Sequence, residues 1–218
     1  MRTASKCAAV LLASAVLLTS ACTRYADDAT ATAGPELLAA AKSGELKCHP
    51  VDVPLVEIER VDDDEPTLKI PTPPGWNRVT GKDTDLLRYT MVNRDLSTFD
   101  FAPTAVAALE SVPDAMEADA VFAAQRKSIV GLGVPESAMD ITDHELCGLP
   151  AQTVRYQVPE MNGLRPHPAT ALFVTYQTEL RTYCAGLTIQ TTAPDNLTYK
   201  RDAETILTGF QVLPSPHA

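Results

Sequence analysis

The chain has 218 residues, a formal net charge of −10 and an aromatic content of only 6%. Its length suits one globular domain whose core is filled mostly by aliphatic side chains. The acidic balance, without a cluster of Lys and Arg, argues against nucleic acid and anionic lipid headgroups as partners.

The first 21 residues predict an export signal. A basic start precedes an apolar run over residues 7–18, about 12 residues against the ~20 that a membrane-spanning helix needs. The run ends in Thr19-Ser20-Ala21 and Cys22, which is similar to the lipobox of bacterial lipoproteins. The similarity implies cleavage before Cys22 and acylation of this cysteine, palmitate included. Several acyl chains would hold the mature protein on the outer face of the cell membrane, from which it could also be released into the envelope.

The mature chain is expected to begin with a tether. Removing the signal takes away two basic residues and no acidic one, so the net charge becomes −12. Small polar residues follow Cys22, as in a flexible linker, and a short helix is expected over residues 35–46. Irregular or edge-strand structure should follow because prolines interrupt the segment. The expected organisation is a signal peptide, a tether, an N-terminal helix with an irregular segment, a folded domain and a tail, over residues 1–21, 22–34, 35–66, 67–213 and 214–218.

Alternating apolar residues predict the strands of the domain. Leu68 and Ile70 mark the first, and the others are expected over residues 86–92, 104–112, 138–143, 151–158, 169–176 and 183–191. The last four should form an antiparallel meander, with turn chemistry at Asn162-Gly163.

Two helices complete the expected domain. The capping-box spacing of Asp114 and Glu117 predicts a helix that ends at Gly131. A second helix should run from about Pro194 to Gly209. Two helices against an antiparallel sheet define an α+β sandwich, and we expect both helices to cover one face of that sheet.

Four motifs carry a resemblance to a known family. They are the lipobox with its polar tether, the strand-and-proline segment 68–76, Gly148-Leu149-Pro150-Ala151 at the start of a strand, and the closing helix 202–210. Their order and spacing resemble the actinobacterial and mycobacterial LpqN/LpqT-type cell-envelope lipoproteins over residues 66–213. The resemblance implies a PsbP-like fold, an exported protein that is not an enzyme, and a connection with envelope glycolipids or membrane partner proteins.

The three remaining cysteines depart from that family pattern. An odd number in an oxidising compartment predicts one disulfide and one buried thiol. In a meander, Cys147 and Cys184 would lie two strands apart, roughly 9.5 Å, whereas a disulfide needs Cα atoms within about 7 Å. Cys48 lies in an irregular segment that could reach either partner. Because Cys147 is at a strand end, before Gly148, we predict the pair Cys48–Cys147, which leaves Cys184 out.

Other chemistry for these residues remains open at this stage. Cys48, His49, His144 and Cys147 meet the ligand count of a zinc site, although adjacent Cys48 and His49 make an awkward geometry. Asp143, His144 and Cys147 supply the residue types of a nucleophilic site without a recognised motif. The acidic run at residues 62–65 lacks the glycine and spacing of a calcium loop. No metal or other cofactor is predicted.

Trp76 is the one candidate ligand-binding residue. It follows a proline-stiffened turn and could form the wall of a pocket, but packing at the end of a strand is the preferred interpretation.

The sequence thus predicts a non-catalytic, lipid-anchored envelope protein that binds an envelope lipid or glycolipid, or a membrane partner that handles one. A protein–protein adaptor without a small-molecule pocket is the alternative, and a hydrolase with a composite site is the remote one.

Overall fold

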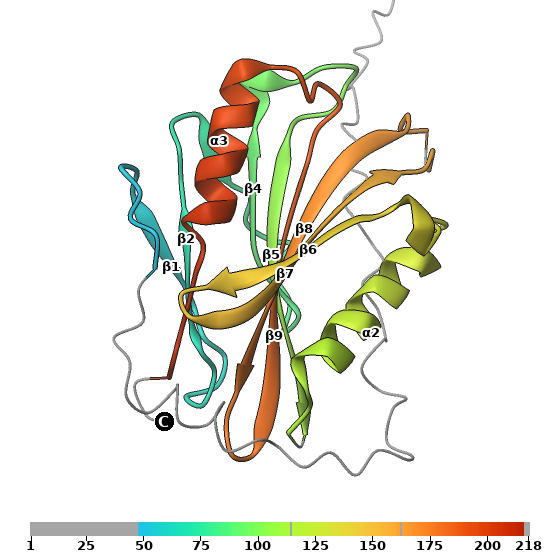
Figure 1. Cartoon of the computed structure of the whole chain (residues 1–218). Helices are drawn as coiled ribbons and strands as arrows, with labels where there is room; N and C mark the ends of the chain where they lie inside the picture. The colour runs from blue at the N-terminus through green and yellow to red at the C-terminus, as the bar shows by residue number, and fades with distance from the viewer. Residues whose placement is uncertain (1–47, 114, 162, 216–218) are drawn as a thin grey trace, which may run out of the picture.

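The computed structural model describes residues 48–113, 115–161 and 163–215. The predicted signal, Cys22, the tether and the helix expected over residues 35–46 lie outside the described residues. Two antiparallel sheets and two α-helices make up the described part (Figure 1).

The larger sheet has seven strands in the order β3-β4-β5-β9-β8-β7-β6. Consecutive strands β6 to β9 pair as the predicted meander, and β5 then pairs with β9. The strands, in chain order, are β3 (Trp76–Arg78), β4 (Leu87–Asn93), β5 (Thr104–Pro113), β6 (Asp140–Leu146), β7 (Leu149–Val158), β8 (His167–Gln177) and β9 (Arg181–Gln190).

A smaller sheet joins the two ends of the domain. Strand β2 (Thr67–Pro71) lies between β1 (Leu55–Ile58) and β10 (Gln211–Leu213). The sequence allowed an edge strand at β1 but did not predict β10, which has three residues and pairs with β2 from the far end of the chain. The folded domain therefore begins before residue 67, the boundary expected from the sequence.

The helices lie on opposite faces of the seven-stranded sheet, so the expectation that both cover one face is wrong. Helix α3 (Leu197–Thr208) packs in one core cluster with Leu172 and Val174 of β8, whereas α2 (Ala118–Gly131) packs in another with Ala171 and Phe173. Successive residues of a strand point to opposite faces, so these two sets separate the helices. Figure 1 shows α3 beside β2. Helix α2 contacts β7 and β8.

The helices cover both faces because the central strands β8 and β9 are apolar and buried on both faces. Alternation with polar neighbours, which predicted a one-sided sheet, is absent from these central strands. The α+β antiparallel sandwich itself is confirmed.

The start of α2 also differs from the expectation. Glu117 is its N-cap residue and makes no side-chain capping bond, so the predicted capping box does not form; Asp114 lies outside the described residues. The helix ends at Gly131 as predicted, but Gly133, with φ of 92°, takes the left-handed conformation. Two 3₁₀ turns, Arg94–Leu96 and Glu136–Ala138, complete the described elements.

Helix α3 ends with Gly209 as its C-cap residue, the stop that the sequence predicts, and the packing leaves no room for a side chain at that position. A Cβ at this position would lie 2.5 Å from Val51 and 2.8 Å from Pro71. Within the described ranges, no helix is both long enough and apolar enough to cross a membrane.

Candidate functional site

A disulfide joins Cys48 to Cys147, the pair expected from the sequence. Cys147 and Gly148 form the two-residue turn between β6 and β7, and both have positive φ. The bond ties the place where the chain enters the described domain to the end of this hairpin. Both sulfurs are used in it, so the zinc site and the Cys147 nucleophile are not formed. A disulfide suits an oxidising compartment.

Asp143 and His144 do not come together either. They are neighbours on β6 and therefore point to opposite faces of the sheet. Asp143 accepts a hydrogen bond from Gln152 at 2.6 Å, and His144 Nε2 lies 2.9 Å from the hydroxyl of Thr153. The third cysteine, Cys184, is buried in the core cluster beneath α2.

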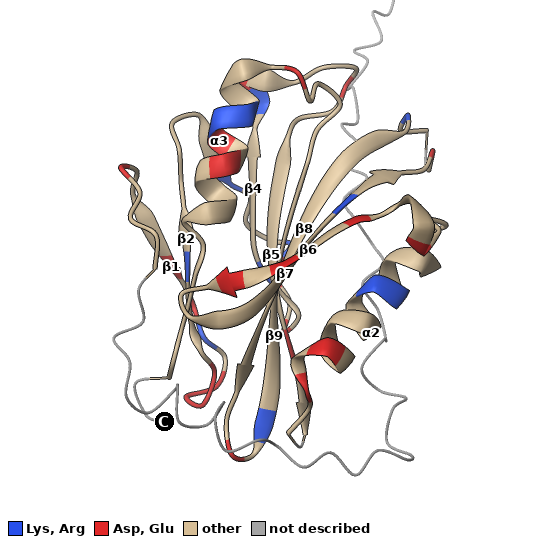
Figure 2. Ribbon diagram, viewed as in Figure 1, with Lys and Arg blue, Asp and Glu red and all other residues tan. Residues whose placement is uncertain are grey.

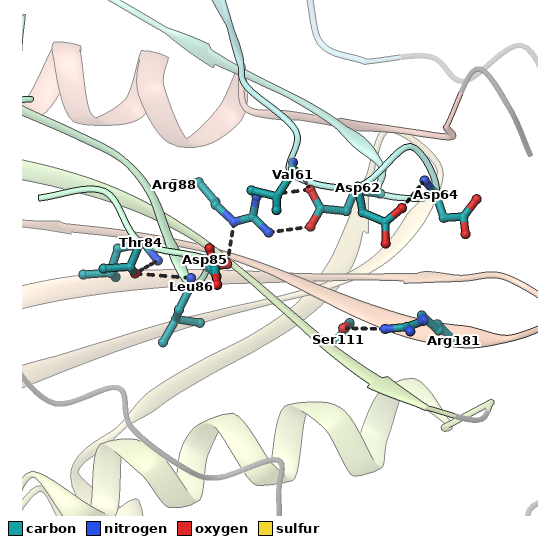
Figure 3. A network of polar contacts seen from close by, with 11 residues as sticks. Val61, Asp62, Asp64, Thr84, Asp85, Leu86, Arg88, Ser111 and Arg181 are labelled. Carbon is teal, nitrogen blue, oxygen red and sulfur yellow. Dashed lines mark hydrogen bonds and ion pairs between the residues drawn. The ribbon is translucent and has the colours of Figure 1, made fainter. Parts of the chain in front are cut away.

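The last residue of the acidic run at residues 62–65, Glu65, is one partner of a buried ion pair. Glu65 and Arg88 are both buried, and the guanidinium binds both carboxylate oxygens, one at 3.1 Å. Glu65 also accepts from the backbone of Val61 at 2.9 Å, and Arg88 donates to the carbonyl of Asp85 (Figure 3). Because both carboxylate oxygens of Glu65 bind Arg88, Glu65 is not available as a calcium ligand.

Trp76 is a core residue. Its side chain is 3% exposed and belongs to the core cluster under α3. Its indole N–H donates to the buried carboxylate of Asp202 at 3.1 Å. This fits the packing role that the sequence favoured, and the geometry gives no support to a pocket wall.

The charges on the surface are mixed. Figure 2 shows acidic residues on β6, on α2 and in several loops, with Lys and Arg scattered among them along the ribbon.

The most unusual exposed feature is the turn between the 3₁₀ turn Arg94–Leu96 and β5. Thr98 and Phe101 exchange backbone hydrogen bonds of 2.9 and 3.0 Å, so Phe99 and Asp100 form a two-residue turn. Both have positive φ, 52° and 60°. Such turns favour Asn and Gly, whereas a bulky residue in this conformation costs roughly 1–2 kcal/mol. Phe99 is nevertheless 63% exposed.

Four side-chain contacts join the Phe99 turn, residues 98–101, to the rest of the domain. The Thr192 hydroxyl donates to the carbonyl of Thr98 at 2.9 Å, and the two threonine hydroxyls lie 2.7 Å apart. The ring of Phe101 packs on that of buried His167, with centroids 5.0 Å apart. The guanidinium of Arg165, from the loop between β7 and β8, lies 3.7 Å from the centroid of the Phe99 ring.

Two other turns of the chain show what this one lacks. Cys147-Gly148 closes β6 and β7, and the turn across which Met161 and Leu164 pair has Gly163 with φ of 78°. Each uses glycine in the left-handed position, but the Phe99 turn has none. Sequence reasoning missed the site because Phe99-Asp100 carries no turn signature and Arg165 is 66 residues away.

The fold defined by these elements is an α+β sandwich of antiparallel sheet and two helices. No protein-family model and no curated protein matches the chain. Its structure is similar to that of LpqN of Mycobacterium tuberculosis, described as involved in cell envelope biogenesis, with a TM-score of 0.57 and 15% identity over 75% of this chain and 93% of that one.

A further match is the Ran-binding protein Mog1p of Saccharomyces cerevisiae, with a TM-score of 0.46 and 11% identity over 75% of this chain and 97% of that one. The similarity to LpqN shows a distant LpqN-like fold. At this identity it does not place the chain in the LpqN family.

Proposed function

We propose that this protein is a non-catalytic lipoprotein of the cell envelope, anchored by acyl chains on Cys22. Its domain would bind an envelope lipid or glycolipid, or a membrane protein that handles one. The observation that carries the proposal is the LpqN-like fold, since the solved LpqN structure is described as that of an envelope-biogenesis protein. The Cys48–Cys147 bond supports an extracytoplasmic location.

The anchor is tested by Cys22→Ala. We expect uncleaved precursor that carries no acyl chains, whereas the unsubstituted chain is cleaved, acylated and partitions into detergent. Cys184→Ala is the matched control, because this buried cysteine lies in the folded domain. Normal processing and partitioning of Cys22→Ala would refute the anchor.

Ligand binding is tested by native mass spectrometry of the mature protein, purified from an actinobacterial host and gently released from detergent. An adduct that extracts into organic solvent would support lipid binding, and its mass would give the ligand class. A bare protein after incubation with total envelope lipid would count against it.

The alternative is a protein–protein adaptor. One observation favours it, the exposed Phe99 in a rigidly held turn. A residue kept exposed at a backbone cost is a candidate for recognition.

A further inference from the structure

We infer that Phe99 and Arg165 form a docking point for a partner protein, which offers an apolar pocket with a carboxylate at its rim. The inference rests on the proposed extracytoplasmic binding role but not on lipid binding. Its test is therefore separate from that of the lipid ligand.

The local backbone conformation does not need a phenylalanine at position 99. A left-handed backbone at this position is suited to Asn or Gly, which would make the same turn with less strain. The phenyl ring is largely exposed, and the Arg165 guanidinium lies over it. The packing of the turn is supplied instead by Phe101 on His167.

The Phe99 ring is held in place before any partner binds. The hydrogen bonds of Thr192 fix the base of the turn, and Arg165 lies over the Phe99 ring. His167, which stacks on Phe101, also holds the Arg165 carbonyl through its Nδ1 at 2.8 Å. A preorganised aromatic side chain loses little conformational entropy on binding.

The Arg165 guanidinium indicates the charge of the partner. Arg165 is exposed, and none of the residues that the structure describes offers it a carboxylate at ion-pair distance. A guanidinium stacked on a ring keeps its N–H edge available, and that edge matches a carboxylate in a bidentate pair. The complementary surface is therefore apolar with an acidic group beside it.

A protein is favoured over a membrane surface for two reasons. The net charge of −10 opposes approach to anionic lipid. The strand directions also place the Phe99 turn and the Cys48–Cys147 bond at opposite ends of the large sheet, since β4 ends near the turn whereas β6 ends at Cys147. The end that carries Cys48, where the described residues begin, is thus not the end that displays Phe99.

The test is a selection of random peptides displayed on phage against the immobilised mature chain with Cys22→Ser. We expect enrichment of an aromatic or aliphatic residue beside Asp or Glu. Because one phenyl ring is an anchor rather than a whole interface, the peptides should bind weakly. Phe99→Asn and Arg165→Gln should each weaken their binding about tenfold or more.

Leu180→Asn is the matched control, because Leu180 is 76% exposed in the turn between β8 and β9, at the other end of the sheet. It should leave peptide binding unchanged. Phe99→Asn should fold with an unchanged or raised Tm, since Asn suits the turn.

Three results would overturn the inference. They are a failure to enrich any peptide, enriched peptides that bind Phe99→Asn as well as the parent, and a marked fall in the Tm of Phe99→Asn, which would make Phe99 a structural residue. Sedimentation with phosphatidylglycerol vesicles decides the remaining case, because vesicle binding that is lost in Phe99→Asn would assign the surface to lipid instead.

Discussion

Trp76 and Asp202 form a hydrogen bond that links β3 to α3 across 126 residues of sequence. Both side chains are buried, and the other carboxylate oxygen of Asp202 accepts two bonds from Arg201, at 2.9 and 3.1 Å. The carboxylate is therefore satisfied on both oxygens only when Trp76 is present.

This bond gives the first prediction. Trp76→Phe keeps an aromatic ring but removes the donor, so one buried carboxylate oxygen loses its partner. We expect the free energy of unfolding in urea to fall by about 1–3 kcal/mol. In the Asp202→Leu background the same change should cost less. Additivity of the two substitutions within about 0.5 kcal/mol would show that they are not coupled.

The buried ion pair of Glu65 and Arg88 gives the second prediction. Arg88→Met leaves a buried carboxylate without its cation, and we expect a loss of about 3–5 kcal/mol in the free energy of unfolding. The double variant Glu65→Gln/Arg88→Met should recover part of it. Lys200→Met is the control, because its pair with Asp195 is exposed and should contribute less than about 1 kcal/mol. Equal effects of the two single variants would contradict the assignment.

The third prediction concerns the disulfide. It closes a separation of 99 residues, for which loop entropy gives roughly 4–5 kcal/mol as an upper value. Cys48→Ala/Cys147→Ala should lose much of this on guanidinium unfolding. Cys48→Ala/Cys147→Gly should be the more stable of the two variants, because Cys147 has φ of 53° and glycine accepts that conformation.

Non-reducing peptide mapping checks the same pair directly. A linked peptide containing Cys48 and Cys147 is expected, and a cross-link through Cys184 would contradict the structure.

The fourth prediction is a loss of stability at high pH. Burial raises the pKa of Tyr156 from 10.0 to about 12. The folded state then holds its proton more tightly than the unfolded state, so this stabilisation is complete below pH 10 and is lost as the pH rises towards 12. Tyr156→Phe should make the fall in the free energy of unfolding between about pH 10 and 12 less steep. The measurement is urea unfolding at each pH, started by rapid mixing. The same slope in both proteins would remove Tyr156 as a cause.

The fifth prediction concerns Thr72, whose hydroxyl oxygen is buried without a hydrogen-bond partner among the described residues. Thr72→Val replaces the hydroxyl with a methyl group of similar shape. We expect the free energy of unfolding, measured by thermal unfolding, to rise by about 1 kcal/mol. Thr98→Val is the contrasting control, because the Thr98 hydroxyl bonds to Thr192. That variant should lose stability.

The candidate site was only partly predictable from the sequence. Strand spacing argued against Cys147–Cys184, and the place of Cys147 at a strand end before Gly148 then favoured its pairing with Cys48. The burial of Trp76 followed from its place after a turn. The hydrogen bond from Trp76 to Asp202 could not be predicted, since no local sequence pattern at either residue indicates the other as its partner. The Phe99 turn was missed because its backbone conformation contradicts its composition.

The sequence by itself determined the longer elements and their types, since the period of apolar residues reflects local backbone geometry. It thereby predicted the strands of the meander, both helices and the stop at Gly209. Only the tertiary structure decided the pairing of β10 with β2, the placement of α2 and α3 on opposite faces, and the meeting of Phe99 with Arg165. These depend on contacts between distant segments, whose geometry is set by how the whole core packs rather than by any local pattern.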